Sequence, residues 1–166
     1  MSTKNLSNKA AIDKLKKLAN SINFAMMATY LQSEPFHTIP MSTKKVDEEG
    51  NIWFLSGRDS EHNKYIQKEG KAQLIYSQPN NMEFMTVYGN ATIHTDKKII
   101  KELYSKADDN WFDGVDDPNA SAIKIQPTDA HYWDTQNGKL VALFKLGVGA
   151  VTGDQPDLGE EGDLIV

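Results

Sequence analysis

The chain has 166 residues, which is enough for one domain with a hydrophobic core and short for two. Its net charge of −5 argues against a surface that binds nucleic acid or an anionic membrane. The lack of cysteine excludes disulfides, thiol catalysis and zinc–thiolate sites. We therefore expect one globular domain over residues 1–166.

The N-terminal segment carries scattered charges and no long apolar run. It predicts neither a signal peptide nor a membrane-spanning helix, and we expect a cytoplasmic protein. Apolar residues recur at helical spacing from Ile12 to Ile22, behind Ser7 and Asn8, which favour the position before a helix. This spacing predicts an amphipathic helix that lies across the core.

Apolar or alternating runs then predict a series of β-strands. The runs are residues 23–31, 37–43, 51–55, 71–77, 82–95 and 121–134. Residues 47–51, DEEGN, are typical of a turn, so the second and third strands should form an antiparallel hairpin. A further helix is expected after Asp96.

Beyond Thr135 the pattern weakens, and residues 136–166 are expected to form an extended C-terminal tail. Its apolar end, Leu164, Ile165 and Val166, needs cover that a partner subunit could supply. Strands joined by turns, with helices only at the periphery, favour a closed or partly closed antiparallel barrel over a parallel sheet with crossover helices.

Arg58 is the only arginine in the chain, and it lies in the segment WFLSGRDSEHNK. The segment predicts a strand, a turn and a helix, with Ser60 as the N-cap and Gly70 as the C-terminal stop. Such a helix start presents backbone N–H groups, and Ser56, Arg58 and Lys64 add hydroxyl and charge, so an anion such as phosphate would fit. The alternative is that Arg58 and Lys64 are ordinary solvated surface residues.

The remaining polar residues do not indicate a metal site. The four histidines are scattered without the spacing of metal ligands. The acidic loop at residues 108–117 has Trp111 and Phe112 where a calcium loop would need oxygen ligands. No metal is predicted.

Several segments between residues 12 and 134 follow a characteristic order and spacing. They are FAMMATY, HTIPM, IWFLSGRDSEHNK, QLIYSQP, MTVYGNATIHTDKKIIKELY, NWF followed by DDP, and AHYWD. In this order the chain resembles the pyridoxamine 5'-phosphate oxidase-like FMN-binding split barrels, specifically the general stress protein 26 group. The resemblance implies a mainly β fold, an antiparallel split β-barrel with Greek-key connections, about six strands and peripheral helices.

The resemblance also implies a homodimer that holds FMN in clefts between its subunits. It assigns His37, Thr38, Ile39, Pro40 and Met41 to the flavin ring, Phe54, Leu55, Ser56, Ser60 and Lys64 to the phosphate and ribityl chain, and Trp111 to the flavin of the other subunit. Many relatives have arginine where this chain has Ile39, so one charged phosphate contact is missing. Arg58 lies in the same cradle and could compensate in part.

For function, the resemblance implies a general stress flavoprotein and an FMN-dependent oxidoreductase, in which flavin N5 exchanges hydride with NAD(P)H or a small substrate. The cofactor carries such chemistry, so no catalytic residue is assigned, and Trp111 and His37 are only candidates. Lys139 and Lys145 are isolated and form no substrate-phosphate cluster, so pyridoxamine-phosphate oxidation itself is not expected. The alternatives are a flavin-binding or flavin-storing protein without turnover, and a degenerate barrel without flavin.

Overall fold

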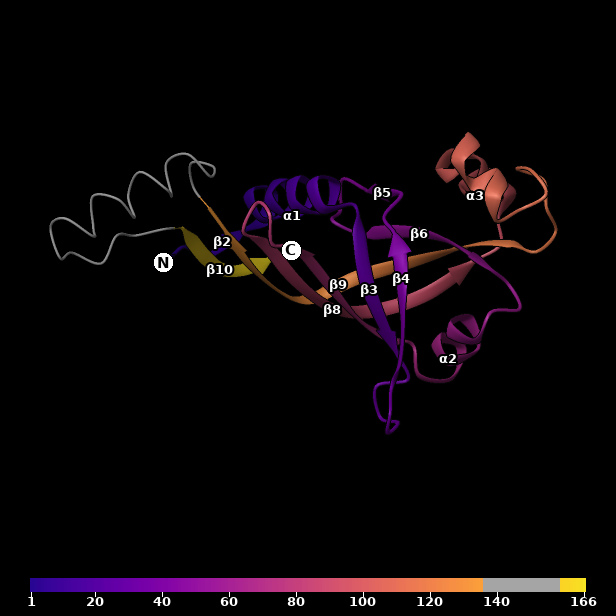
Figure 1. Ribbon diagram of the computed structural model, residues 1–166, viewed down its shortest axis with the longest axis horizontal. Coiled ribbons are helices and arrows are strands. Elements are labelled where there is room, and N and C mark those ends of the chain that lie inside the picture. The colour runs from indigo at the N-terminus through magenta and orange to yellow at the C-terminus, as the bar shows by residue number, and fades with distance from the viewer. Residues whose placement is uncertain (136–158) are drawn as a thin grey trace, which may run out of the picture.

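Ten strands join in one hydrogen-bonded sheet within the residues that the computed structural model describes, 1–135 and 159–166 (Figure 1). The strands are β1 (Ser2–Thr3), β2 (Leu6–Ser7), β3 (Phe24–Thr29), β4 (His37–Ser42), β5 (Lys45–Val46), β6 (Ile52–Gly57), β7 (Lys71–Gln78), β8 (Glu83–His94), β9 (Ala120–Asp134) and β10 (Glu160–Ile165). The helices are α1 (Asn8–Ile22), α2 (Glu61–Glu69), α3 (Lys97–Leu103) and the 3₁₀ helix η1 (Lys106–Asn110).

The sheet is mainly antiparallel and does not close. Its path runs β4–β3–β7–β8–β9, and β9 then pairs with different strands along its length. Residues 120–125 of β9 pair with β6, whereas residues 131–134 pair with β10, which in turn pairs in parallel with β1 and β2. The expected mainly β split barrel with peripheral helices is confirmed.

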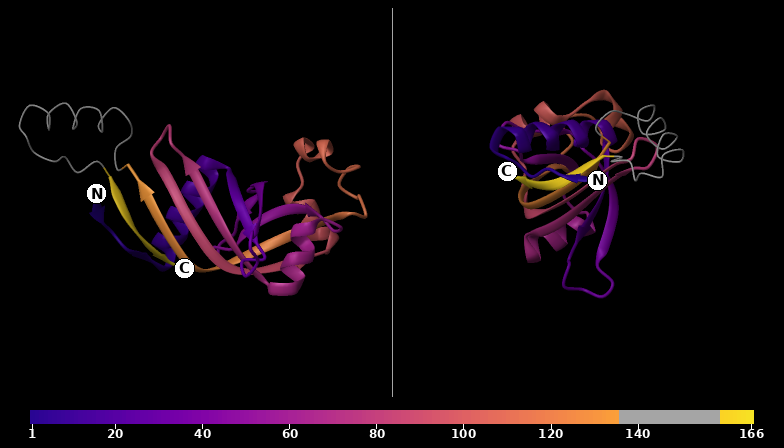
Figure 2. Two further views of the ribbon diagram at one scale, coloured as in Figure 1. Left: turned by 60° about the horizontal axis from the view of Figure 1, so that its bottom comes forward. Right: turned by 90° about the vertical axis from the view of Figure 1, so that its left-hand side faces the viewer.

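Two regions of this sheet are named here. The split is the gap between β4 and β6, which are not hydrogen-bonded to each other. The arm consists of β1, β2, β10 and residues 131–134 of β9. Both chain ends lie at the arm, and α3 lies at the opposite end of the molecule (Figure 2).

Helix α1 supplies a large part of the core, as its periodicity predicted. Its buried side chains are Ala11, Leu15, Leu18, Ala19 and Ile22. They join one hydrophobic cluster with inward-facing side chains of the strands, including Phe54 and Tyr132. Burial of this apolar stripe, and not the N-cap, stabilises the helix, because the Ser7 side chain makes no capping hydrogen bond.

Helix α2 begins and ends where its capping residues predicted. The Ser60 hydroxyl accepts a hydrogen bond from the backbone N–H of Asn63. Gly70 takes the left-handed conformation, with φ of 65°, and its N–H donates to the carbonyl of Ile66. These caps fix the direction in which the first turn of α2 faces the split.

The DEEGN turn does not join β4 to β6, as the sequence analysis expected. It joins β6 to the short strand β5, and the Asp47 carboxylate accepts hydrogen bonds from the backbone N–H of Asn51 and from Nε1 of Trp53. Strand β4 pairs only with β3 within the described residues. The second and third predicted strands are therefore the two walls of the split and not a hairpin.

The end of the predicted tail belongs to the sheet of the same chain. Residues 160–165 form β10, and Leu164 is buried in the core cluster. The rest of the predicted tail, residues 136–158, lies outside the described residues. The cover for Leu164 comes from its own subunit.

A buried ion cluster joins α1 to the arm. The Nζ atom of Lys14 lies 2.6 Å from a carboxylate oxygen of Asp134 and 2.8 Å from one of Glu160. Burial lowers the pKa of Lys14, but its hydrogen bonds and the charges of both carboxylates outweigh burial, so the pKa is raised. The cluster ties the N-terminal helix to the last strands of the chain.

A β-bulge interrupts the pairing of β8 with β9. Gly89 is opposite Pro127 and Tyr88 is opposite Asp129, so Thr128 is the extra residue. A Cβ atom on Gly89 would lie 2.2 Å from the carbonyl oxygen of Gln126, which no side chain allows. Glycine is therefore required at the bulge.

Within residues 1–135 and 159–166, no helix combines the length and the apolar character that crossing a membrane requires.

Candidate functional site

A cavity of about 360 Å³ lies at the split, within the size range of small-molecule sites, roughly 300–1,000 Å³. Its walls come from both sides of the gap and from the loop after η1. From the strands, the lining residues are Phe24 of β3, Ile39, Pro40, Met41 and Ser42 of β4, and Leu55, Ser56 and Gly57 of β6. The others are His62 of α2, Asp108 of η1, and Lys44, Trp111, Phe112 and Asn119 from the connecting segments. Both apolar and polar groups therefore face one partly open cavity.

One wall is the free edge of β4. Because β4 pairs only with β3 among the described strands, its second edge presents backbone groups to the cavity. Pro40, which has no N–H, is found on such edges because no ladder hydrogen bond is lost there. This edge can hydrogen-bond the rim of a flat heterocycle.

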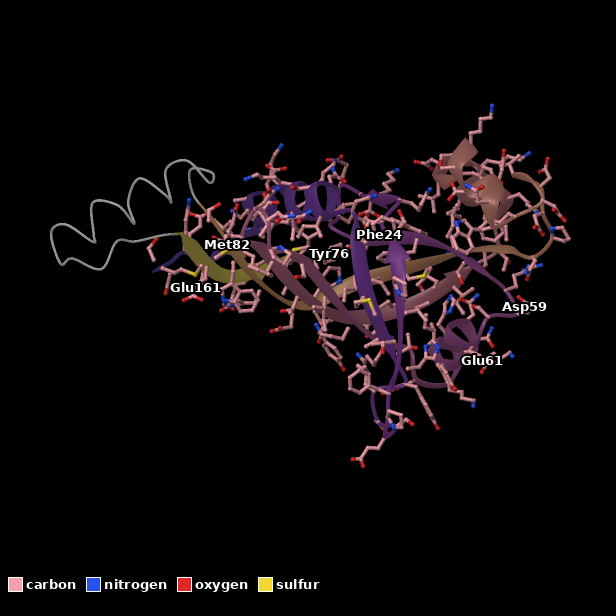
Figure 3. All side chains as sticks on the ribbon, viewed as in Figure 1. Phe24, Asp59, Glu61, Tyr76, Met82 and Glu161 are labelled. Carbon is pink, nitrogen blue, oxygen red and sulfur yellow. The ribbon has the colours of Figure 1, made fainter. Side chains whose placement is uncertain are left out.

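The opposite wall carries a group of two hydroxyls and an imidazole. The Nε2 atom of His62 lies 2.7 Å from the hydroxyl oxygen of Ser56 and 3.0 Å from that of Ser60. Ser56 is the last residue but one of β6, Ser60 is the N-cap of α2, and His62 lies in the first turn of α2. Figure 3 labels Asp59 and Glu61, the acidic residues on either side of Ser60.

A buried amide fixes the protons in this group. Asn63 donates from Nδ2 to the hydroxyl of Ser121, which donates to the carbonyl of Ser56. The Ser56 hydroxyl in turn donates to Oδ1 of Asn63 at 2.8 Å. Its oxygen is then an acceptor toward His62, so neutral His62 carries its proton on Nε2.

His62 is uncharged at neutral pH. Burial and, to a smaller extent, the charge of His37 lower the pKa of His62 to about 4. The two imidazole rings stack with centroids 6.4 Å apart. The Nδ1 atom of His37 is buried and has no hydrogen-bond partner among the described residues, so one donor or acceptor beside this wall is unused.

The other end of the cavity is closed by an ion pair. Nζ of Lys44 lies 2.7 Å from the Asp108 carboxylate and 3.3 Å from the hydroxyl of Ser105. Burial raises the pKa of Asp108, but hydrogen bonds from Lys44 and Ser105 outweigh burial and hold it below its ordinary value. This ion pair holds η1 in place across the split, together with the loop after η1 that carries Trp111.

Half of the residues that the sequence assigned to the cofactor line the cavity. They are Ile39, Pro40, Met41, Leu55, Ser56 and Trp111, and the last is 82% exposed. The other half is not in the lining: His37, Thr38, Phe54, Arg58, Ser60 and Lys64. Ser60 does bond to His62, which lines the cavity. The cofactor contacts of these six stay predictions.

Phe54, Arg58 and Lys64 have contacts away from the cavity. Phe54 is fully buried in the core. Arg58 donates from Nη1 to the carbonyl of Pro118 at 3.1 Å, and Nζ of Lys64 lies 2.7 Å from the Glu61 carboxylate. Neither cation faces the cavity in this arrangement.

Sequence reasoning missed several lining residues. They are Phe24, Ser42, Lys44, Gly57, His62, Asp108, Phe112 and Asn119. Lys44 and Asp108 are 64 residues apart, so nothing in the local sequence pairs them. His62 could have been found from its place two residues after the N-cap Ser60, where a side chain can turn back toward the cap.

The outer face of the sheet beside the cavity is apolar and uncovered. Phe24, labelled in Figure 3, projects from the start of β3 and is exposed. Met26 is 43% exposed and Ile75 is 44% exposed, and the two are direct neighbours across β3 and β7. Pro40 is opposite Met26 on the other side, so this surface runs continuously into the cavity wall.

The open sheet, with a small-molecule cavity between β4 and β6, which do not pair with each other, defines a split-barrel protein with its site at the split. The chain belongs to the pyridoxamine 5'-phosphate oxidase-like family, because the family description "Pyridoxamine 5'-phosphate oxidase like" matches residues 10–157. No curated protein matches the sequence.

Solved structures with similar folds agree with this family. A protein of Jannaschia sp. CCS1 named for general stress protein 26 has a TM-score of 0.77 and 25% identity, over 93% of this chain and 95% of that one. General stress protein 26 of Bacillus anthracis str. Sterne has a TM-score of 0.61 and 20% identity, over 71% and 92%. A pyridoxamine 5'-phosphate oxidase-related, FMN-binding protein of Nostoc punctiforme has a TM-score of 0.59 and 14% identity, over 75% and 82%.

Proposed function

We propose that the protein is an FMN-binding oxidoreductase of the general stress type, with FMN in the cavity at the split and NAD(P)H or a small molecule as its redox partner. One observation carries the proposal. The free backbone edge of β4 and the side chains of Ser56 and His62 face the same cavity from opposite walls, and Ser60, outside the lining, hydrogen-bonds to His62. A flat ring with a phosphate-bearing chain needs both kinds of wall.

The chemical character of the lining residues suits FMN. The edge of β4 would hydrogen-bond the ring, and the apolar side chains of Met41 and Leu55 would pack beside it. Ser60 and His62 would donate to the phosphate, while Ser56 holds His62 in place. Bound FMN would supply hydride exchange at N5, and the protein would orient the ring and exclude water.

The proposal includes a homodimer. Phe24, Met26 and Ile75 form an exposed apolar surface that is continuous with the cavity through Pro40. Surfaces of this kind on soluble proteins are commonly interaction sites. A second copy of the chain would cover this surface and the exposed Trp111, and would complete the wall of the cavity.

A flavin-storing protein without turnover is the second candidate. The charged residues on the described cavity wall, Lys44 and Asp108, form an ion pair. The Nε2 atom of His62 is hydrogen-bonded to the hydroxyls of Ser56 and Ser60. This arrangement leaves no side chain of the described wall free to move a proton to or from a substrate. It favours a binding role over acid–base catalysis. Hydride transfer itself requires no acid or base from the protein.

The visible spectrum of the purified protein, before and after incubation with FMN, tests the proposal. We expect bound flavin, and a larger rise in melting temperature with FMN than with riboflavin. Bleaching on anaerobic addition of NADH or NADPH would support the oxidoreductase, and bound flavin that is never reduced would support storage. Failure to bind either flavin would refute both.

A pair of capping variants separates cofactor binding from folding. Ser60→Ala and Asp96→Ala each remove the N-cap side chain of a helix, at a cost of about 1 kcal/mol. Only Ser60 lies beside the cavity group. FMN affinity should fall in Ser60→Ala and stay unchanged in Asp96→Ala.

A further inference from the structure

The proposed phosphate end of the cavity has no permanent cation on its described wall. Ile39 is apolar, Arg58 donates to a backbone carbonyl, and Lys64 pairs with Glu61. Lys44 lies on the wall but is held by Asp108. A phosphate dianion in this place would therefore face hydroxyls, backbone N–H groups and one ionisable side chain, His62.

The hydrogen bonds around His62 decide what it can do. The Ser56 hydroxyl donates its hydrogen bond to Oδ1 of Asn63, so it cannot donate to an anion as well. His62 donates from Nε2 toward Ser56 and Ser60, and its Nδ1 is the unprotonated atom. A proton added to Nδ1 would give the wall a positive charge without breaking this arrangement.

We propose that His62 is the residue by which this cavity distinguishes a flavin phosphate from an uncharged flavin, and that it takes up one proton when the phosphate binds. The inference rests on the proposed function. The proton comes from the solvent and stays on the imidazole, so the bound complex gains one positive charge beside the phosphate. No bond other than N–H is formed.

Two ion pairs lie near His62, Lys64 with Glu61 and Lys44 with Asp108. The titratable and charged groups around it are His37 from β4, Arg58 and Asp59 from the turn, Glu61, Lys64 and Tyr65 from α2, and Lys44 with Asp108 across the cavity, while β6 and β9 add the uncharged Ser56 and Ser121. Figure 3 shows Asp59 and Glu61 at the start of α2. His37 is left as the group that opposes protonation of His62.

The sign of the pH effect follows from these contacts. The pKa of free His62 is about 4, and a neighbouring phosphate dianion raises it. Between the two values, FMN binding takes up a proton, so FMN affinity should rise as the pH falls. The phosphate itself titrates near pH 6, so the measurement belongs at about pH 5 to 6.5, where the difference between the parent and His62→Gln separates the imidazole proton from that of the phosphate. Riboflavin affinity should not change in this range.

Isothermal titration of FMN and of riboflavin, each in two buffers of different ionisation enthalpy, measures the proton directly. We expect uptake with FMN and none with riboflavin. His62→Gln should abolish the uptake and weaken FMN by about tenfold to a hundredfold, the range of a charge-assisted hydrogen bond. His94→Gln, a histidine outside the cavity, should behave as the parent.

A second variant keeps the test valid if His62→Gln folds poorly. His62→Lys supplies a cation that needs no proton, so it should retain FMN binding and lose the uptake and the pH dependence. FMN binding in the parent without proton uptake, or uptake that persists in His62→Gln, would overturn the inference and leave the proposed function standing. Binding of neither flavin would refute both.

Discussion

The arm and the split belong to the same sheet, but their ionisable side chains have different surroundings. At the arm, Lys14 lies between two buried carboxylates, at 2.6 and 2.8 Å, and each charge has a partner within its own chain. At the split, His62 lies beside hydroxyls, with no carboxylate within hydrogen-bond distance among the described residues. Lys14 is kept charged by its surroundings, whereas His62 is kept neutral.

This difference separates a structural role from a binding role. The charges of the Lys14 cluster already compensate one another, so a ligand would add no electrostatic stabilisation there. A neutral imidazole on a cavity wall can still gain a charge and a partner. Changes at the arm should therefore alter folding, and changes at the split should alter ligand binding.

Removal of Lys14 should have the largest effect. Lys14→Met removes the shortest of these ion pairs and leaves Asp134 to the exposed Lys17, at 3.3 Å, and Glu160 to the exposed Lys4, at 3.6 Å. It should reduce the free energy of unfolding by up to about 3–5 kcal/mol, the loss for a broken buried pair. Because the pKa of Lys14 is raised, its contribution is complete below the ordinary lysine pKa and is lost as the pH rises through the raised value. Urea unfolding measures both effects.

Lys16→Met is the matched control. Lys16 pairs with the exposed Glu48, so its loss should cost less than about 1 kcal/mol. Equal losses in the two variants would mean that the cluster at the arm is not a special source of stability.

A charge on the apolar surface beside the cavity should dissociate the dimer. Met26→Glu should weaken dimerisation at least about thirtyfold, the loss expected at the centre of an interface, and should release bound flavin. Ile165→Glu changes an exposed apolar residue of the arm and should remain dimeric. Sedimentation velocity compares the two, and a dimeric Met26→Glu would place the interface elsewhere.

An arginine on β4 should tighten FMN binding. Ile39 lines the cavity, and Ile39→Arg should improve FMN affinity about tenfold through a bidentate pair, with riboflavin nearly unchanged. Arg58 is held by the carbonyl of Pro118, so the gain should be the same in an Arg58→Ala background. A larger gain in that background would show that Arg58 already serves the phosphate.

The smallest effect is expected at Lys64. Its side chain is 52% exposed and pairs with Glu61, so Lys64→Ala should change FMN affinity less than about twofold. The resemblance alone predicts a larger loss, because it assigns Lys64 to the phosphate. Fluorescence titration with FMN distinguishes these expectations, and a tenfold loss would mean that Lys64 leaves Glu61 when the cofactor binds.

Features that depend on neighbouring residues could be predicted from the sequence. Ser60 and Gly70 bound α2 because capping involves hydrogen bonds over three or four residues. The long strands could be predicted in the same way, since side-chain alternation marks the buried face. The sequence alone therefore predicts the strand–turn–helix at the split correctly.

Features that depend on distant partners could not. The sequence of β10, EEGDLI, is rich in residues that strands disfavour, and it is a strand because β9, β1 and β2 supply its hydrogen bonds. Lys44 finds Asp108 only through the fold. For His62 the local sequence gives only its place two residues after the N-cap Ser60, and its contact with Ser56 on the cavity wall appears only in the fold.

The bulge at Thr128 also decides which side of the arm meets α1. Before it, the side chains of Ile123 and Ile125 are buried, at odd positions; after it, those of Tyr132 and Asp134 are buried, at even positions. One additional residue has shifted the phase of the alternation. In a chain lacking Thr128, the buried and exposed side chains of β9 in the arm would exchange faces. The Asp134 carboxylate, which contacts Lys14, would then point into the solvent.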